Sequence, residues 1–215
     1  MTDSYKHKGL RKKLVEQIKS KGITDQNVLA AIEKVPRHFF MDSSFVEIAY
    51  QDKPFPIGEG QTISQPYTVA FQSELLKIKK GDKVLEVGTG SGYQSCILLE
   101  MGAKVFTIER IKALYQKTKV LLPQMGYNPK MFFGDGYKGL SAYAPFDKII
   151  VTAGAPLVPE ELLQQLMIGG IMVIPVGAND LQTMILINKT AIDVYDKKEM
   201  GAFRFVPLLE DKHFD

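Results

Sequence analysis

The feature that most limits how this chain can fold is a glycine-rich turn between a short apolar run and a helical stretch. Lys83 to Val87 is typical of a strand, glycines follow at Gly88, Gly90 and Gly92, and a helical pattern begins at Tyr93. Glycines at such a turn let the backbone reverse tightly and bring its N–H groups against a ligand. The sequence therefore predicts an α/β fold with a binding site where this strand leads into a helix.

Short apolar runs alternate with helical stretches after residue 80, which predicts right-handed βαβ units around a mostly parallel sheet. Beyond Gly177 the helical stretches stop, so we expect antiparallel strands at the end of the sheet. We expect one domain, 1–215, with a doubly wound α/β sheet in 81–215 and N-terminal helices and a long loop in 1–80. Strands are expected at 83–87, 104–109, 131–133, 148–152, 171–176, 183–188, 192–196 and 202–206, and helices at 68–76, 93–101, 112–125 and 159–167.

Composition excludes several classes of protein. The net charge of +3 is too small for a surface that binds nucleic acid, and no apolar run approaches the length of a membrane span. The single cysteine, Cys96, fits a reducing compartment and a core position, and His7, His38 and His213 are scattered along the chain. We therefore expect a cytoplasmic protein that binds neither membrane nor nucleic acid and holds no metal.

The segment from Tyr50 to Pro66 ahead of the sheet contains three prolines and two glycines, and we expect it to be a loop. Loops of this length in a compact domain are usually lids or binding loops. This segment is therefore a candidate part of the functional site.

Acidic residues accompany the predicted strand ends. Glu86 precedes the first glycine by two residues, where a carboxylate would repel a pyrophosphate and attract a cation. Glu109 ends the next strand and could accept hydrogen bonds from ribose hydroxyls, and Asp135 with Gly136 could meet an adenine. This arrangement resembles the first motif of methyltransferases that use S-adenosylmethionine, a cofactor with a sulfonium, an ammonium and no phosphate.

The loop before the sheet carries a more specific resemblance. Gln61-Thr-Ile-Ser-Gln-Pro-Tyr67, with Pro54-Phe-Pro-Ile-Gly58 ahead of it, resembles the signature of the protein-L-isoaspartate O-methyltransferase family. The resemblance runs from Lys34 to Leu208 and includes Asp135-Gly136, Ala144-Pro-Phe-Asp147, Ala153-Gly-Ala-Pro156, Gly169-Gly170, Pro175-Val-Gly177 and Arg204-Phe-Val-Pro-Leu208.

The resemblance implies a Rossmann-like class I fold and a specific reaction. A methyl group would pass from S-adenosyl-L-methionine to the α-carboxylate of L-isoaspartyl residues in damaged proteins and peptides, leaving S-adenosyl-L-homocysteine and starting repair through a succinimide. That carboxylate is ionised at neutral pH and needs no general base. Some members carry histidine where this chain has Tyr67, so no histidine-dependent step is expected.

The same resemblance implies roles for individual residues. Ser64 would hold the substrate carboxylate, although a serine before a helix is also a common N-cap. The segment Val206, Pro207 and Leu208 would hold the substrate backbone as an added strand, although proline also marks an ordinary sheet edge. The residues expected to bind the cofactor are Thr62, Ile63, Glu86, Gly88, Thr89, Gly90, Gly92, Glu109, Asp135 and Gly136.

Three rival functions can use parts of this pattern. An NAD-dependent oxidoreductase is disfavoured by the glycine spacing and by Glu86, and a nucleic-acid methyltransferase by the absence of a base-holding motif or a basic groove. A cofactor-binding sensor would be expected to have lost the glycines or the serine loop, and both are intact. The sequence leaves the oligomeric state open and is compatible with a monomer.

Overall fold

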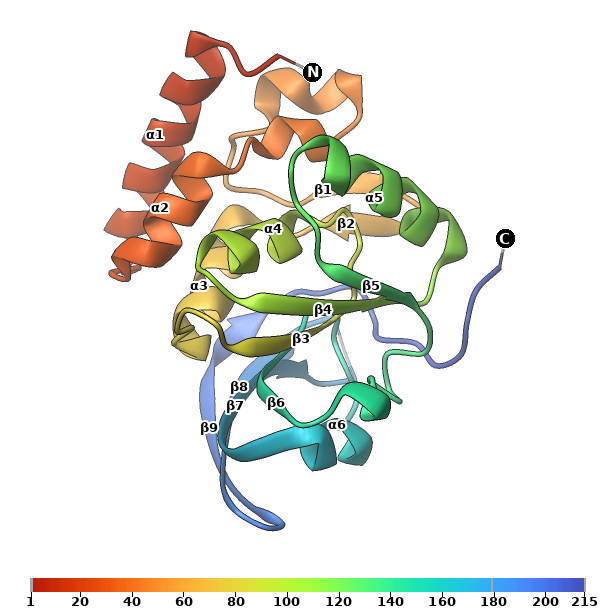
Figure 1. The fold of residues 1–215 in the computed structure, drawn as a ribbon. Coiled ribbons are helices and arrows are strands. Elements are labelled where there is room, and N and C mark those ends of the chain that lie inside the picture. The colour runs from red at the N-terminus through yellow and green to blue at the C-terminus, as the bar shows by residue number, and fades with distance from the viewer. Residues whose placement is uncertain (1, 179, 215) are drawn as a thin grey trace.

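A seven-stranded sheet with strand order β5-β4-β3-β6-β7-β8-β9 forms the centre of the molecule (Figure 1). The computed structural model describes residues 2–178 and 180–214. Strands β5 to β7 in that order pair in parallel, and β8 and β9 add antiparallel pairs. This confirms the expected mostly parallel sheet with an antiparallel end. The strands are β3 (Lys83–Val87), β4 (Lys104–Glu109), β5 (Lys130–Phe133), β6 (Phe146–Val151), β7 (Leu166–Val176), β8 (Gln182–Ala191) and β9 (Val194–Phe203).

Helices cover both faces of the sheet, because successive strand residues point to opposite faces. On β3, Val84 packs into the apolar cluster beneath α3 to α5, whereas Leu85 packs into the cluster beneath α6. Helices α1 and α2 lie outside α3 and α4 and form the expected N-terminal cap (Figure 1). The helices are α1 (Tyr5–Ser20), α2 (Gln26–Lys34), α3 (Pro66–Leu76), α4 (Tyr93–Glu100), α5 (Lys112–Gln124) and α6 (Glu160–Gln165), with short 3-10 turns at Arg37–Phe40, Ser43–Ile48 and Ser141–Tyr143.

The direction of strand addition reverses between β3 and β6. From β3 the chain adds β4 and β5 on one side, and then returns to place β6 and β7 on the other. The loops that leave the carboxyl ends of β3 and β6 therefore diverge and open a crevice, which is where ligands of open α/β sheets bind.

The segment before the sheet is not entirely loop, and this corrects our expectation for 50–66. Phe55–Gly58 (β1) and Gln61–Ile63 (β2) form an antiparallel hairpin. The two turn residues, Glu59 and Gly60, have φ angles of 54° and 65°, which suit a tight type I′ turn. The prolines of this segment are typical of loops, so the sequence did not predict the hairpin. Both strands of a two-stranded ribbon are edge strands, and edge strands tolerate proline.

Two boundaries near the C-terminus also differ from the expected ones. The helix expected at 159–167 ends at Gln165, and the next strand already begins at Leu166. The strands expected at 192–196 and 202–206 are a single strand, β9, which leaves Val206 beyond its end. Charged residues on this exposed edge strand interrupt the apolar alternation, which is how edges are commonly protected.

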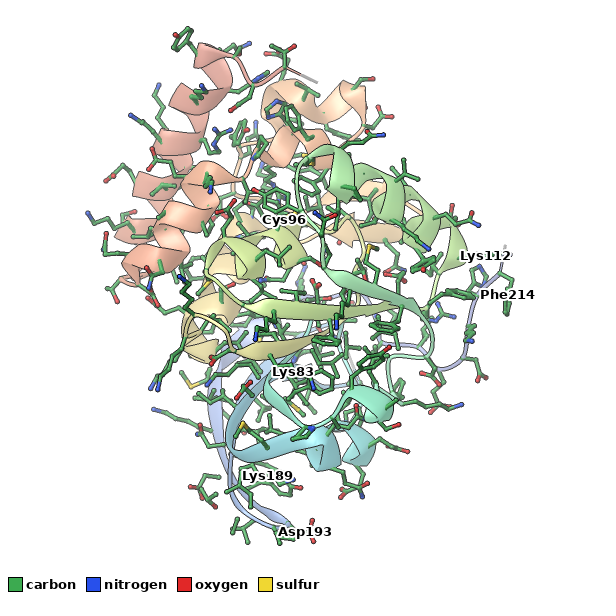
Figure 2. All side chains as sticks on the ribbon, in the orientation of Figure 1. Lys83, Cys96, Lys112, Lys189, Asp193 and Phe214 are labelled. Atoms are coloured by element: carbon green, nitrogen blue, oxygen red, sulfur yellow. The ribbon has the colours of Figure 1, made fainter. Side chains whose placement is uncertain are left out.

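Cys96 lies inside the molecule, and Asp193 lies at the tip of the β8–β9 hairpin (Figure 2). Cys96 has no exposed surface, and burial raises the pKa of its thiol. This confirms the expectation of a small core residue. Within the described ranges, no helix combines the length and apolar character that a membrane crossing requires.

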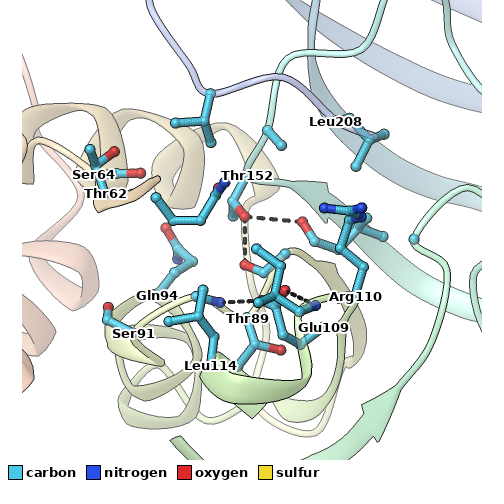
Figure 3. A pocket seen from close by; sticks show the side chains of 18 of the residues that line it. Thr62, Ser64, Thr89, Ser91, Gln94, Glu109, Arg110, Leu114, Thr152 and Leu208 are labelled. Atoms are coloured by element: carbon cyan, nitrogen blue, oxygen red, sulfur yellow. Dashed lines mark hydrogen bonds between the residues drawn. The ribbon is translucent and has the colours of Figure 1, made fainter. Parts of the chain in front are cut away.

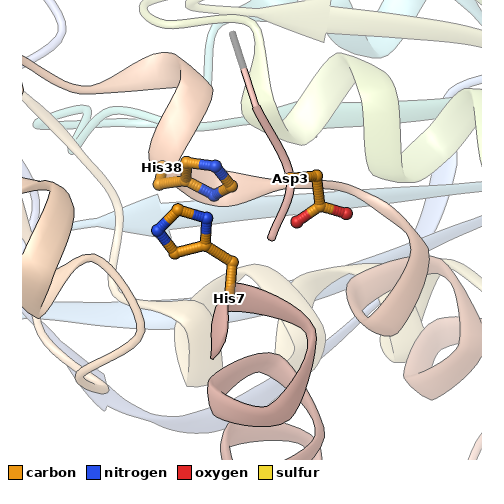
Figure 4. Close-up of side chains that lie close together, drawn as sticks. All are labelled: Asp3, His7 and His38. Atoms are coloured by element: carbon orange, nitrogen blue, oxygen red, sulfur yellow. The ribbon is translucent and has the colours of Figure 1, made fainter. Parts of the chain in front are cut away.

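The N-terminal cap brings together residues that are distant in sequence (Figure 4). The ring centroids of His7 and His38 lie 3.9 Å apart, although the two residues are far apart in the sequence. His38 Nδ1 lies 2.6 Å from the Tyr50 hydroxyl, and Asp3 and the two histidines offer atoms within 4.8 Å of one another. Both Asp3 oxygens accept hydrogen bonds from Arg11, at 3.0 and 2.9 Å. The contacts of this cluster therefore hold Asp3 against the N-terminal cap.

We expect the contacts of the Asp3, His7 and His38 cluster to weaken as the pH falls. Burial lowers the pKa of His38 below 6.5; the hydrogen bond with the Thr2 carbonyl and the charge of Asp3 oppose this, and His7 and Arg11 add to it. The unfolded chain then binds the proton more readily, so stability present above pH 6.5 is lost as the pH falls below it. Hydrogen exchange of α2 amides should show less protection at pH 5 than at pH 7.5, and a His38→Gln variant should lose most of that difference. Equal protection of the wild type at both pH values would contradict this account.

Candidate active site

A cavity of about 790 Å³, counting its open mouth, lies at the carboxyl ends of β3, β4 and β6 (Figure 3). Its walls come from the glycine turn, the β2 segment, the residues after β4 and β6, and the stretch after β9. It therefore occupies the crevice that the reversal of strand order predicts. The predicted site residues that line it are Thr62, Ile63, Ser64, Gly88, Thr89, Gly90, Glu109, Gly136, Val206, Pro207 and Leu208.

The glycine turn is held close to the neighbouring strand ends. Gly88 has a φ of 97°, and an added Cβ would lie 2.5 Å from the Thr152 hydroxyl oxygen. That hydroxyl donates to the Gly88 carbonyl at 2.6 Å. Gly92 was expected to bind the cofactor, but it does not line the cavity. The absence of a side chain at Gly92 instead leaves room for Thr118 on α5. Of the three glycines in this turn, Gly88 and Gly90 therefore line the cavity.

Glu109 ends β4 and faces the cavity with its carboxylate already oriented. Its Oε2 accepts a hydrogen bond from the Gly90 N–H at 2.8 Å, and its Oε1 accepts one from the Ile111 N–H at 2.9 Å. Burial raises the pKa of Glu109, and these backbone donors oppose the rise. Each carboxylate oxygen retains a lone pair for a ligand hydroxyl.

Glu86 does not line the cavity, which corrects our expectation that its charge meets the cofactor. The alternation of β3 turns its side chain under α4, where the Ser95 hydroxyl donates to Oε2. Glu86 is fully buried, Oε1 has no hydrogen-bond partner among the described residues, and burial raises the pKa to about 8. Its carboxyl is therefore mostly neutral at pH 7 and supplies no anion to the site.

Asp135, the acidic residue that follows β5, was also expected to bind the cofactor, but its side chain does not reach the cavity. The Asp135 Oδ1 accepts a hydrogen bond from the Tyr137 N–H at 2.9 Å, and the side chain does not line the cavity. Gly136 does line it, and a Cβ there would lie 2.6 Å from Val87. The backbone at Gly136, rather than the carboxylate before it, reaches the cavity wall.

Ser64 lies between β2 and α3 and lines the cavity. The N-cap of α3 is Gln65, whose own side chain makes no capping hydrogen bond, and Ser64 lies before this position, so the structure gives Ser64 no capping role. Asp52 fixes this turn instead, since its Oδ1 accepts from the Tyr67 N–H at 2.8 Å and its Oδ2 accepts from the Gln65 side chain at 3.1 Å. The residues that directly follow Ser64 are thus held by the buried carboxylate of Asp52, which sequence reasoning missed.

The segment after β9 runs beside Gly154, which lies three residues after the end of β6. The Gly154 N–H donates to the Val206 carbonyl at 2.8 Å, and the Leu208 N–H donates to the Gly154 carbonyl at 2.7 Å. In an extended segment the polar groups of the intervening residue point the other way. Pro207 therefore turns its carbonyl away from Gly154 and has no N–H to offer.

The cavity also has walls that sequence reasoning missed. Thr152 and Ala153 directly follow β6, and Arg110 directly follows β4. Their positions at or directly after the ends of predicted strands were an available signal, because such residues meet at the ligand-binding edge. Gln94 had no such signal, since it lies inside a helix.

Comparison with known proteins settles the family. The family model described as protein-L-isoaspartate(D-aspartate) O-methyltransferase matches residues 9–213. The chain belongs to this family. A protein-L-isoaspartate O-methyltransferase from Christiangramia forsetii is 64% identical over 214 residues, covering 99% of this chain and 100% of the relative. One from Dictyoglomus thermophilum is 48% identical and covers 96% and 93%.

Solved structures agree with this family assignment. A Plasmodium falciparum member of the family, solved with S-adenosyl-L-homocysteine, matches with a TM-score of 0.82 and 27% identity, covering 94% of this chain and 99% of the other. Another protein-L-isoaspartate O-methyltransferase matches with a TM-score of 0.85 and 28% identity over 94% of this chain and 67% of that one. The Rossmann-like class I fold is therefore shown.

Proposed function

We propose that this chain transfers the methyl group of S-adenosyl-L-methionine to the α-carboxylate of L-isoaspartyl residues in damaged proteins and peptides. The observation that carries the proposal is the meeting of three separate segments at one cavity. The glycine turn, the Ser64 turn and the Val206–Leu208 segment all line it, although they are far apart in the chain. Family membership supports the same reaction.

The walls of the cavity fit the cofactor. We propose that Glu109 accepts hydrogen bonds from the ribose, since its carboxylate is buried, oriented and still has lone pairs. The backbone at Gly88, Gly90 and Gly136 would lie against the cofactor, together with Thr62, Ile63 and Thr89. S-adenosyl-L-methionine supplies an electrophilic methyl group when it is bound.

The chain itself needs to orient the substrate and exclude water. The substrate carboxylate is ionised at neutral pH, so no side chain has to remove a proton. We propose that the Ser64 hydroxyl donates to this carboxylate, and that the Pro207 carbonyl accepts from a backbone N–H of the substrate. Because Pro207 has no backbone N–H, its carbonyl is the one backbone hydrogen-bonding group that it offers. A contact with the substrate backbone does not depend on the substrate's side chains, so it suits recognition of many peptide sequences.

Replacing Glu109 with alanine should weaken binding of S-adenosyl-L-homocysteine about ten- to a hundredfold. The change removes charge-assisted hydrogen bonds worth about 1.5–3 kcal/mol and frees the N–H groups of Gly90 and Ile111. Calorimetric titration measures the effect. Glu161→Ala, at an exposed position on α6, serves as the matched control and should bind as the wild type does. Unchanged affinity in Glu109→Ala would remove this residue from the site.

Transfer of a labelled methyl group tests the function itself. With methyl-labelled cofactor and an isoaspartyl peptide, label should enter the peptide as an ester. The ester should then release methanol without the enzyme, because the following backbone nitrogen closes a succinimide. Retention of label in a stable amide or amine would contradict the proposed acceptor.

We also propose that the two parts of the chain act as one methyltransferase domain. Residues 1–80 supply the Ser64 turn, and residues 81–215 supply the sheet and the Val206–Leu208 edge. A cytoplasmic location is proposed because the single, buried Cys96 fits a reducing compartment.

A further inference from the structure

The backbone on the amino-terminal side of Ser64 is fixed by the β1–β2 hairpin. Ile63, directly before it, pairs with Phe55 in that hairpin and is 2% exposed. On the other side α3 begins at Pro66, and its N-cap, Gln65, makes no capping hydrogen bond with its own side chain. The first N–H groups of a helix have no acceptor within the helix. An acceptor from another segment is therefore needed at the start of α3.

Asp52 supplies this acceptor. Its Oδ1 accepts from the Tyr67 N–H at 2.8 Å, and its Oδ2 accepts from the Gln65 side chain at 3.1 Å. A carboxylate at a helix N-terminus is favoured by the helix dipole as well as by its hydrogen bonds. The Asp52 side chain is 2% exposed and does not line the cavity, whereas Ser64 lies beside Thr62 in the cavity wall (Figure 3). Asp52 thus anchors the residues after Ser64 from outside the cavity.

Two basic side chains fix Asp52 and the loop that carries it. Lys21, the C-cap of α1, donates to the Asp52 Oδ2 at 2.5 Å. Arg37 is fully buried and donates to the Ala49 carbonyl at 3.1 Å and to the Lys53 carbonyl at 3.3 Å. These two carbonyls lie on either side of Asp52 in the chain, so Arg37 fixes the loop around the carboxylate. The N-terminal cap is thereby connected to the turn after β2.

We propose that Asp52 is a positioning residue for methyl transfer, because it holds the turn after β2 so that the Ser64 hydroxyl points at the acceptor carboxylate. The inference rests on the proposed function, in which Ser64 donates to that carboxylate. Misplacement of a reacting group by about 1 Å costs about a hundredfold in rate, so a turn that is fixed before the substrate arrives contributes to the rate. Asp52 acts on the rate through Ser64 and leaves cofactor binding unchanged.

Replacing Asp52 with alanine should lower kcat on an isoaspartyl peptide about ten- to a hundredfold, because both acceptors of the turn are lost. Calorimetry should show that this variant still binds S-adenosyl-L-homocysteine within about threefold of the wild type, as a folded protein does. Asp52→Asn retains an acceptor for the Tyr67 N–H and should recover most of the lost rate. Asp42→Ala is the matched control, because this exposed aspartate accepts from the Ser44 N–H at 2.9 Å and does not line the cavity. It should keep the rate of the wild type.

A double variant separates positioning from a general loss of structure. If Asp52 acts through Ser64, adding Asp52→Ala to Ser64→Ala should slow methyl transfer by less than about twofold more. Independent defects would instead multiply, since their free energies add. An equal factor in both backgrounds, an Asp52→Asn variant as slow as Asp52→Ala, or loss of cofactor binding in Asp52→Ala would overturn the proposal.

The outcomes separate the inference from the function on which it rests. If the wild type transfers no methyl group to the isoaspartyl peptide, the proposed function fails. If the wild type is active and Asp52→Ala keeps its rate, the function stands and the positioning role of Asp52 fails.

Discussion

Replacing Glu86 with glutamine is expected to stabilise the protein, and the gain should grow as the pH rises from 5 to 8.5. Glu86 is fully buried beneath α4, and burial raises the pKa to about 8, while the Ser95 and Thr107 hydroxyls oppose the rise and Glu109 adds to it. The unfolded chain ionises this carboxyl near pH 4.5. Glutamine occupies nearly the same volume, carries no charge and can still accept from the Ser95 hydroxyl.

The sign of this effect follows from proton binding. Between pH 4.5 and 8 the folded protein holds the Glu86 proton, whereas the unfolded chain releases it. The contribution of Glu86 to stability is therefore fully present below pH 4.5 and is lost as the pH rises through 8. A difference between pKa values of 4.5 and about 8 corresponds to roughly 4 to 5 kcal/mol above pH 8.

Urea unfolding of the two proteins at several pH values measures this difference. The free energy of unfolding of Glu86→Gln, minus that of the wild type, should increase steadily from pH 5 to pH 8.5. Glu161→Gln, at an exposed position, should show a small and constant difference. A constant difference for Glu86→Gln across the same range would show that Glu86 is ionised in the folded protein.

The sequence predicted the sheet well where two independent signals agreed. The bounds of β3 and β4 match the expected ones, because each apolar run is short and is followed at once by a helical pattern. The hairpin at 55–63 was missed because its prolines are typical of loops, and only pairing between the two strands stabilises it.

The candidate site was predictable in position and less so in detail. Residues at strand ends, such as Glu109, face the cavity as expected, since the topology places all such ends at one edge. Glu86 was misjudged because its direction depends on strand alternation and its charge depends on burial. Asp52 was not predicted because its role arises from contacts between separate segments, which no local pattern records.

Replacing Ser64 with alanine should slow methyl transfer about 30- to 1000-fold while leaving cofactor binding close to that of the wild type. The loss corresponds to about 2–4 kcal/mol, the size expected when one positioned donor is removed from a reacting oxygen. Ser64 caps no helix, so folding should be little affected. An unchanged rate would remove Ser64 from the catalytic site.

The central claim is that the cavity selects an isoaspartyl carboxylate. The isoaspartyl linkage routes the main chain through the β-carbon and leaves its α-carboxylate one carbon closer to the backbone than an aspartyl side chain. A site framed by the Ser64 turn and the Val206–Leu208 edge should align only one of these two geometries with the methyl donor. Methyl transfer loses about a hundredfold in rate for misplacement near 1 Å.

The most direct test measures initial rates of methyl transfer to two peptides of identical sequence, one with an isoaspartyl and one with an aspartyl residue. We predict rapid methylation of the isoaspartyl peptide and at most about a hundredth of that rate on its aspartyl twin. Equal rates on the two peptides would contradict the account.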